Sequence, residues 1–164
     1  MAKLQRLTPC LWFDGEAENA AKFYVSIFKN AKLGKISRFS KEGFEVHRQP
    51  EGRVMVAEFE IEDMSFIALN GGPQFKFSEA ISFQVSCDTQ EEIDYYWSRL
   101  TADGGAEGSC GWLKDKFGLS WQVIPSTIGS MMTDPDPAKP QRVMQAFMQM
   151  KKLDLAELQR AYAG

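Results

Sequence analysis

The stretch LWFDGE at residues 11–16, followed by FY at residues 23–24, decides the expected fold because its pattern occurs twice. An apolar run, an acidic turn and an aromatic amphipathic segment return in the same order at ISFQV (81–85), DTQEE (88–92) and YYW (95–97). Neither copy is large enough to bury its own apolar face. The repeat therefore predicts a single domain, residues 1–164, built from two paired half-units.

Composition excludes two classes of partner. The chain has 44% hydrophobic and 25% charged residues, as in ordinary globular proteins. A net charge of −3 and scattered basic residues argue against binding nucleic acid through its phosphates. No apolar run approaches the roughly 18 residues of a membrane span, and residues 1–6 do not resemble a signal peptide. Three widely spaced cysteines, Cys10, Cys87 and Cys110, favour reduced thiols in a cytoplasmic protein.

The first half, residues 7–72, predicts a strand, a helix and three further strands. Asp14 is the expected N-cap of the helix, and Asn30 its expected end. A polar loop is expected at residues 40–52. The expected strands are residues 7–13, 32–39, 54–61 and 64–69.

The second half, residues 80–125, predicts the same order. A strand is expected at residues 80–85, a helix at 89–100 and a final strand at 119–124, with further strand structure around 107–114. The remaining tail, residues 134–164, starts with the stiff linker DPDP. It predicts two amphipathic helices at residues 141–150 and 154–163, and the methionines of the first are expected to pack in a core.

Five motifs carry a family resemblance. They are LTPCLWFDG (7–15), FIALNGGP (66–73), CGWLKDKFG (110–118), SWQ (120–122) and MKKLD (150–154). With them the chain resembles the PhnB-like branch of the vicinal oxygen chelate superfamily, which includes glyoxalases, bleomycin-resistance proteins and extradiol dioxygenases. The resemblance, which extends into the tail, implies an α+β fold of paired βαβββ modules around a pocket, with a C-terminal helical extension. It also implies a homodimer.

Proteins of this branch often carry the name 3-demethylubiquinone-9 3-methyltransferase. The usual site for S-adenosylmethionine needs a glycine turn between a strand and a helix of a parallel sheet. The only comparable pair, Gly71-Gly72, is followed by Pro73 and a further loop. The residues therefore do not support a methyltransferase.

The superfamily's enzymes hold a divalent metal with His or Glu from four strands. The matching positions here are Thr8 or Pro9, residues 67–70, Ile81 or Ser82, and Gln122. None of them offers an imidazole or a carboxylate, so we expect no metal and no cofactor. The only histidine, His47, lies in the polar loop, where a structural role is expected.

The leading hypothesis is a protein that binds a small organic molecule in an aromatic-lined cleft. Aromatic walls with a few polar groups suit such a ligand, although strand aromatics also pack in cores, as is expected for Trp121 and equally for Trp12. The candidate binding residues are Trp12, Phe13, Asn70, Phe75, Phe77, Trp112 and Gln122.

Two other hypotheses stay open. A metal-independent lyase, isomerase or hydrolase could use Glu58 and Glu60, which share one face of a strand, with Arg38 as an anion clamp. Cys110 is a weaker candidate nucleophile because only His47 could activate it. In the third hypothesis the fold and its methionine-rich tail serve mainly for contact with a second copy or another partner.

Overall fold

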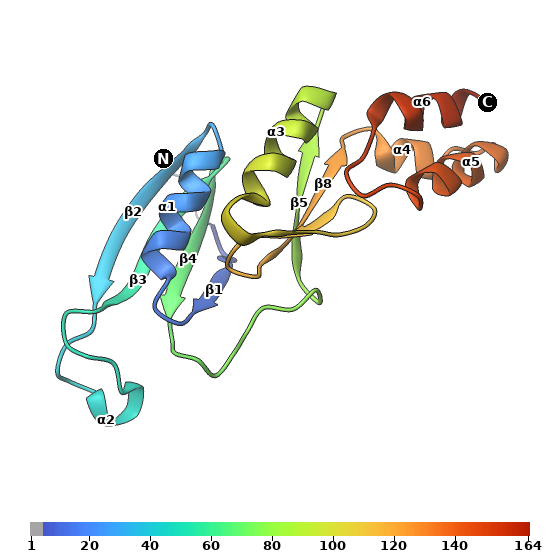
Figure 1. The fold of residues 1–164 in the computed structure, drawn as a ribbon. Coiled ribbons are helices and arrows are strands. Elements are labelled where there is room, and N and C mark those ends of the chain that lie inside the picture. The colour runs from blue at the N-terminus through green and yellow to red at the C-terminus, as the bar shows by residue number, and fades with distance from the viewer. Residues whose placement is uncertain (1–4) are drawn as a thin grey trace. The chain divides into compact units, whose positions relative to one another are not determined.

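The computed structural model describes residues 5–164 (Figure 1). The chain divides into two compact units, Met1–Lys76 (unit 1) and Phe77–Gly164 (unit 2). Unit 1 contains a four-stranded sheet, one long helix and one short helix. Its elements are β1 (Cys10–Phe13), α1 (Ala17–Ile27), β2 (Ala31–Arg38), α2 (Phe44–His47), β3 (Val54–Ile61) and β4 (Met64–Asn70). The strand order is β1-β4-β3-β2, with β1 parallel to β4 and the other pairs antiparallel.

Helix α1 covers one face of this sheet (Figure 1). Its alanines at positions 17, 20 and 21 are fully buried, which lets the helix lie close to the strands. The Tyr24 ring packs 5.7 Å from the ring of Phe59, and Phe59 stacks on Phe66 at 5.1 Å. Because side chains alternate along a strand, the intervening residues point to the opposite side, which we call the far face. The far face of unit 1 carries Val56, Glu58 and Glu60 of β3 and Ser65, Ile67 and Leu69 of β4.

The start of α1 is not capped as expected. The helix begins at Ala17, and the residue at the N-cap position, Glu16, makes no side-chain capping bond. Instead, Asn70 of β4 accepts a hydrogen bond from the Ala17 N–H through Oδ1 (2.9 Å) and donates from Nδ2 to the Val54 carbonyl (3.0 Å). The expected Asp14 cap was therefore wrong, because the sheet supplies the cap from 53 residues away. The helix also ends at Ile27, before Asn30, because Phe28 is extended and buried.

Unit 2 repeats this arrangement and adds a helical tail. Its elements are β5 (Ser82–Cys87), α3 (Gln90–Leu100), a 3-10 turn (Ala102–Gly104), β6 (Ala106–Glu107), β7 (Trp112–Lys114), β8 (Ser120–Pro125), α4 (Ile128–Met132), α5 (Ala138–Phe147) and α6 (Leu155–Ala163). The strand order is β5-β8-β7-β6, with β5 parallel to β8. The Thr89 hydroxyl caps α3 by accepting from the Glu92 N–H (3.2 Å). Each unit thus has the βαβββ order, and the predicted fold class is confirmed.

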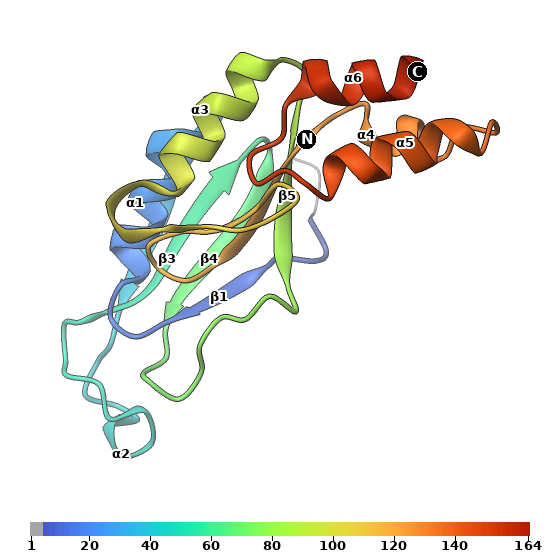
Figure 2. The same cartoon turned by 45° about the vertical axis from the view of Figure 1, so that its right-hand side comes forward.

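The tail contains the two expected helices at somewhat different bounds (Figure 2). Residues 134–164 form α5, which begins at Ala138 and ends at Phe147, and α6, while α4 comes before them in the chain. The helical core contains Met131, Val143, Leu153 and Leu158, and Met150 packs against it. The expected packing of methionines therefore holds for Met150 but not for Met144 and Met148, which are 45% and 59% exposed. The side of α5 that carries Val143 is the buried one.

The segment between α5 and α6 pairs with the turn before β7. The Cys110 N–H donates to the Met150 carbonyl and the Gly111 N–H to the Lys151 carbonyl, both at 2.8 Å. The Leu153 side chain packs so closely on Gly111 that a Cβ there would lie 3.1 Å from Leu153 Cδ1. The tail is thereby joined to the sheet of unit 2 by backbone hydrogen bonds and by apolar contact.

Candidate functional site

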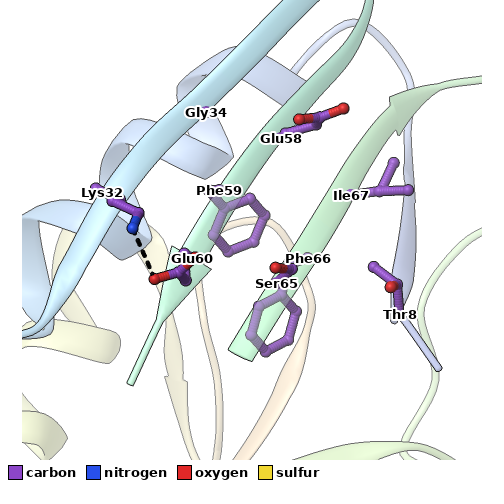
Figure 3. Close-up of a pocket in the computed structure, with 9 residues that line it drawn as sticks. All are labelled: Thr8, Lys32, Gly34, Glu58, Phe59, Glu60, Ser65, Phe66 and Ile67. Atoms are coloured by element: carbon purple, nitrogen blue, oxygen red, sulfur yellow. Dashed lines mark ion pairs between the residues drawn. The ribbon is translucent and has the colours of Figure 1, made fainter. Parts of the chain in front are cut away.

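A cavity of about 250 Å³ opens in unit 1 (Figure 3). It lies where β2, β3 and β4 run side by side, near the residues that lead into β1. The residues that line it are Thr8, Lys32, Gly34, Glu58, Phe59, Glu60, Ser65, Phe66 and Ile67.

Strand register brings the polar groups of this pocket together. Glu60 lies opposite Lys32 of β2 on one side and opposite Ser65 of β4 on the other, and Glu58 lies opposite Ile67. Directly opposed residues have their Cβ atoms about 5 Å apart and point to the same face. The stacked rings of Phe59 and Phe66 support these strands from the helix face.

The pocket carries a net negative charge. Its two carboxylates, Glu58 and Glu60, face one ammonium group, that of Lys32. Lys32 Nζ lies 3.0 Å from Glu60 Oε1, with side-chain exposures of 71% and 29%. A pair this exposed adds at most about 1 kcal/mol to stability, but it means that the Glu60 carboxylate already has a cation beside it. Within residues 5–164, no cation lies in ion-pair range of Glu58.

Gly34 lets β2 pack closely against Glu58 of β3. A Cβ at Gly34 would lie 2.9 Å from Glu58 Cβ and 3.1 Å from the Glu58 carbonyl oxygen. The β2–β3 register shifts between Leu33 and Ile36, so the strand bulges at this glycine. A larger residue here would push β2 away from β3.

The residues predicted for a metal-free enzyme are only partly brought together. Glu58 and Glu60 both line the pocket. Arg38 lies opposite Val54 at the other end of the β2–β3 ladder, and its Nη1 donates to the Gly52 carbonyl (3.0 Å). The predicted anion clamp is therefore not among the residues lining the pocket.

The predicted aromatic residues of unit 1 divide between surface and core. The Trp12 and Phe75 rings meet edge to face at 4.9 Å, and Trp12 Nε1 donates to the Gly72 carbonyl (2.8 Å). Phe75 is 65% exposed, whereas Phe13 is buried on the helix face. Both ends of the Asn70 amide are used to hold α1 and β3. Phe13 and Asn70 therefore serve packing and capping.

In unit 2, the predicted Trp112 and Gln122 lie opposite each other on β7 and β8. Gln122 Nε2 donates to Ser82 Oγ (2.8 Å), and its Oε1 accepts from Gln84 Nε2 (3.2 Å). Ser120, on the same face, is fully buried, and its hydroxyl has no hydrogen-bond partner among the described residues. Phe77 is half-buried in the segment before β5, and Trp121 is buried, as expected.

The positions that would hold the superfamily's metal do not fit one. In unit 1 they offer the Thr8 hydroxyl and the Ile67 side chain; in unit 2 they offer the Ser82 hydroxyl and a Gln122 amide already engaged by its neighbours. No group of three or more His, Cys, Asp or Glu side chains gathers within residues 5–164. Neutral hydroxyl and amide donors are poor ligands for Zn²⁺, Ni²⁺ or Fe²⁺.

His47 and Cys110 have separate surroundings. His47 Nδ1 accepts from the Gln49 N–H (2.9 Å), and its ring packs 4.7 Å from Phe39, so it organises the loop around α2. Cys110 lies in unit 2 with its Sγ 3.9 Å from Met148 Sδ, and unit 2 contains no histidine.

The chain is similar to a known protein family in sequence and in structure. The family model described as 3-demethylubiquinone-9 3-methyltransferase matches residues 5–124. The chain belongs to this family. A PhnB protein of Bacillus cereus that bears the same family name is 34% identical, with 74% of this chain and 99% of that chain covered and a TM-score of 0.65. The PhnB-like resemblance is thereby confirmed.

A second solved structure supports the fold of this family member. Protein PA1353 of Pseudomonas aeruginosa is 19% identical, with 75% of this chain and 98% of that chain covered and a TM-score of 0.58. None of the curated proteins compared with the chain matches it. The family match ends before β8 does, so the expected resemblance of the tail stays a prediction.

The family name does not correspond to a methyltransferase site in this structure. Gly71 and Gly72 follow β4, and the chain then reaches β5 without an intervening helix. Gly71 packs against the Trp12 ring, where a Cβ would lie 2.2 Å from Cζ2. This turn therefore packs an indole and has no helix N-terminus that could receive a cofactor.

The sequence prediction missed the groups that complete the pocket. Lys32, Gly34 and Ser65 were not singled out, and Thr8 and Ile67 were considered only as metal positions. A signal for Ser65 exists: the two-residue turn at Glu62-Asp63 pairs β3 with β4 and places Ser65 beside Glu60.

No helix of residues 5–164 is long and apolar enough to span a bilayer.

Proposed function

We propose that this family member binds a small organic molecule in the unit 1 pocket. The observation that carries the proposal is the cavity of about 250 Å³, in which hydroxyl and carboxylate groups lie beside the apolar Ile67 side chain. Ligand sites usually combine apolar walls with a few fixed polar groups, and drug-sized ligands occupy about 300–1,000 Å³. A cavity of the present size suits a smaller metabolite.

The rigidity of the pocket supports this proposal. Gln5 holds the end of β4 at Ser65 by two bonds: its Oε1 accepts from the Ser65 N–H (2.8 Å) and its Nε2 donates to the Ser65 carbonyl (2.9 Å). Phe59 and Phe66 are 2% and 5% exposed and pack beneath the strands on the helix face of the sheet. A site that is already ordered loses little entropy when a ligand binds.

The remaining accessible candidates are proposed as ligand contacts of their own units. They are Trp12 and Phe75 in unit 1 and, separately, Phe77, Trp112 and Gln122 in unit 2. The proposal also includes a homodimer, which the family resemblance implies. A cytoplasmic location is proposed because Cys10, Cys87 and Cys110 are all free thiols.

A metal-independent enzyme is the second candidate, favoured by the presence of both Glu58 and Glu60 in the pocket. With Glu60 paired to Lys32, Glu58 is the carboxylate placed to act as a general base. If this function is correct, the protein should convert a bound compound to product, and the variant Glu58→Gln should lose that turnover.

A thermal-shift screen with metabolites tests the binding function. A ligand at about 100 times its Kd stabilises the fold by about 2.7 kcal/mol, which raises Tm by several degrees. Ile67→Phe fills the pocket and should abolish the shift, whereas Val56→Phe, on the far face outside the pocket lining, should retain it. A broad screen without any shift above one degree would contradict the proposal.

A further inference from the structure

We infer that the ligand of the unit 1 pocket is a small organic cation carrying a primary amine, and that Glu58 binds its ammonium group. This inference rests on the proposed function, because it names the chemical class of the molecule that the same pocket holds. It follows from the charges, the acceptor groups and the shape of the pocket.

The first argument is the imbalance of charge. Of the two carboxylates in the lining, Glu60 is paired with Lys32 at 3.0 Å, and Glu58 has no cation in range within the described chain. The Lys32 ammonium is thus engaged, and no arginine lines the pocket. A ligand ammonium beside Glu58 would balance the charge, whereas a ligand carboxylate or phosphate would meet uncompensated repulsion.

The second argument concerns hydrogen bonds. A primary ammonium group has three donors and no acceptor. Three acceptor side chains line the pocket: the Glu58 carboxylate on β3, the Ser65 hydroxyl on β4 and the Thr8 hydroxyl in the segment before β1 (Figure 3). Serine and threonine hydroxyls accept as well as donate, so these residues add neutral acceptors for ammonium protons to the charged acceptor Glu58.

The third argument is the surroundings of Glu58. On the side of β2, Gly34 packs closely against Glu58 and presents no side chain to the pocket. On its other flank Glu58 lies opposite Ile67, whose side chain is half-buried and apolar. A ligand with an ammonium group at one end and a short hydrocarbon frame at the other matches this neighbourhood.

The test uses matched trios of compounds and the full-length ¹⁵N-labelled protein. Each trio contains an amine, an alcohol and a carboxylate on one carbon frame, for example cyclohexylamine, cyclohexanol and cyclohexanecarboxylate, with further trios on propyl and benzyl frames. Amide shifts of Gly34, Ser65 and Ile67 report occupancy of the pocket and yield Kd. The amine should bind about 10- to 100-fold more tightly than its alcohol, as expected for a charge-assisted hydrogen bond.

Two variants and a salt series separate the charge of Glu58 from its bulk. Glu58→Gln keeps the size and removes the charge, and should bring the amine's Kd to that of the alcohol. Glu45→Gln makes the same change of net charge in α2, outside the pocket, and should leave both values unchanged. Raising NaCl from 50 to 500 mM should weaken binding of the amine but not of the alcohol.

The outcomes distinguish the two proposals. Equal affinities for amine and alcohol, tighter binding of the carboxylate, or an amine affinity unchanged in Glu58→Gln would overturn the cation while leaving pocket binding in place. If no compound of any trio moves the Gly34, Ser65 and Ile67 amides at millimolar concentration, the pocket is not a ligand site and both proposals fail.

Discussion

Glu60 and Lys114 occupy equivalent positions in the two units although their charges are opposite. Glu60 lies opposite Ser65 on β3 and β4, and Lys114 lies opposite Ser120 on β7 and β8. Each is paired with a residue of the other sign: Glu60 with Lys32 at 3.0 Å, and Lys114 with Glu79 at 2.6 Å. By the same register, the pair Glu58 and Ile67 of unit 1 corresponds to the pair Trp112 and Gln122 of unit 2. The repeat has thus kept its geometry while the chemistry of its far faces has diverged.

Replacing Asn70 should destabilise unit 1. Asn70→Ala removes the bonds to the Ala17 N–H and the Val54 carbonyl and leaves both groups buried without their partner. Loss of such a cap and of a buried hydrogen bond costs about 2 kcal/mol. Urea unfolding followed by circular dichroism measures the change. Asn19→Ala, on the exposed side of α1, is the control and should change stability by less than about 0.5 kcal/mol.

Asp115 should be as important to unit 2. It is 2% exposed, and its Oδ1 accepts from the N–H groups of Phe117 and Leu119 while its Oδ2 accepts from Trp121 Nε1. Asp115→Ala should therefore cost about 3 kcal/mol and change the fluorescence of Trp121. A loss below about 1 kcal/mol would show that the turn re-forms without this carboxylate. The exposed Asp103→Ala provides the comparison.

The tail should loosen in acid. The Tyr162 hydroxyl donates to Asp134, and this bond, followed by smaller effects of the Asp136 backbone and Lys139, lowers the pKa of Asp134 below its usual 3.8. Because the folded-state pKa is depressed, the stabilisation is present above pH 4 and is lost as the pH falls through the lowered value. Hydrogen exchange of α6 amides should accelerate there, and Tyr162→Phe should remove this dependence.

The same pair predicts loosening in strong base. The hydrogen bond to Asp134 is the main cause that raises the pKa of Tyr162 above its usual 10.0. With a raised folded-state pKa, the stabilisation is complete below pH 10 and is lost as the pH rises through the Tyr162 value. Tyrosinate absorbance near 295 nm, compared between the full chain and Tyr162→Phe, measures that titration. A difference spectrum that titrates at or below pH 10 would contradict the prediction.

The three cysteines should react with iodoacetamide in a definite order. Burial is the first cause that raises the pKa of Cys87 to about 12, and this side chain is only 1% exposed. Burial also raises the pKa of Cys10, to a smaller extent. Since the thiolate is the nucleophile and must be reached by the reagent, we expect the exposed Cys10 and the half-buried Cys110 to be alkylated at pH 8 while Cys87 stays protected until the protein unfolds. Peptide mass spectrometry over time reports this order, and early labelling of Cys87 would refute it.

Local patterns were sufficient to predict much of the fold. The repeated strand–turn–helix stretch identified both modules, and the helix expected at residues 89–100 is α3, which begins at Gln90 after the Thr89 cap. The start of α1 could not be found this way, since its cap is Asn70, a partner from another strand. The tail likewise depended on which side of α5 meets Leu153 and Leu158, which the spacing of methionines does not reveal.

The candidate site shows the same division. Alternation along β3 correctly placed Glu58 and Glu60 on one face. The partner of Glu60 depends on the β2–β3 register, and the bulge at Gly34 shifts that register in a way that no short pattern encodes. Arg38 was proposed beside the glutamates without knowledge of this register, which places it opposite Val54 at the other end of the β2–β3 ladder.

The hydrogen bonds from Cys110 and Gly111 to residues 150–151 have a consequence for where this protein can be cut. A chain ended at residue 124, the limit of the family match, would lose both acceptors and the Leu153 side chain that covers Gly111. Two amide groups and an apolar surface beside β7 would then face water. The boundary of the family match therefore falls inside a packed part of unit 2, and a chain shortened to it should be less stable than one that keeps residues 150–153.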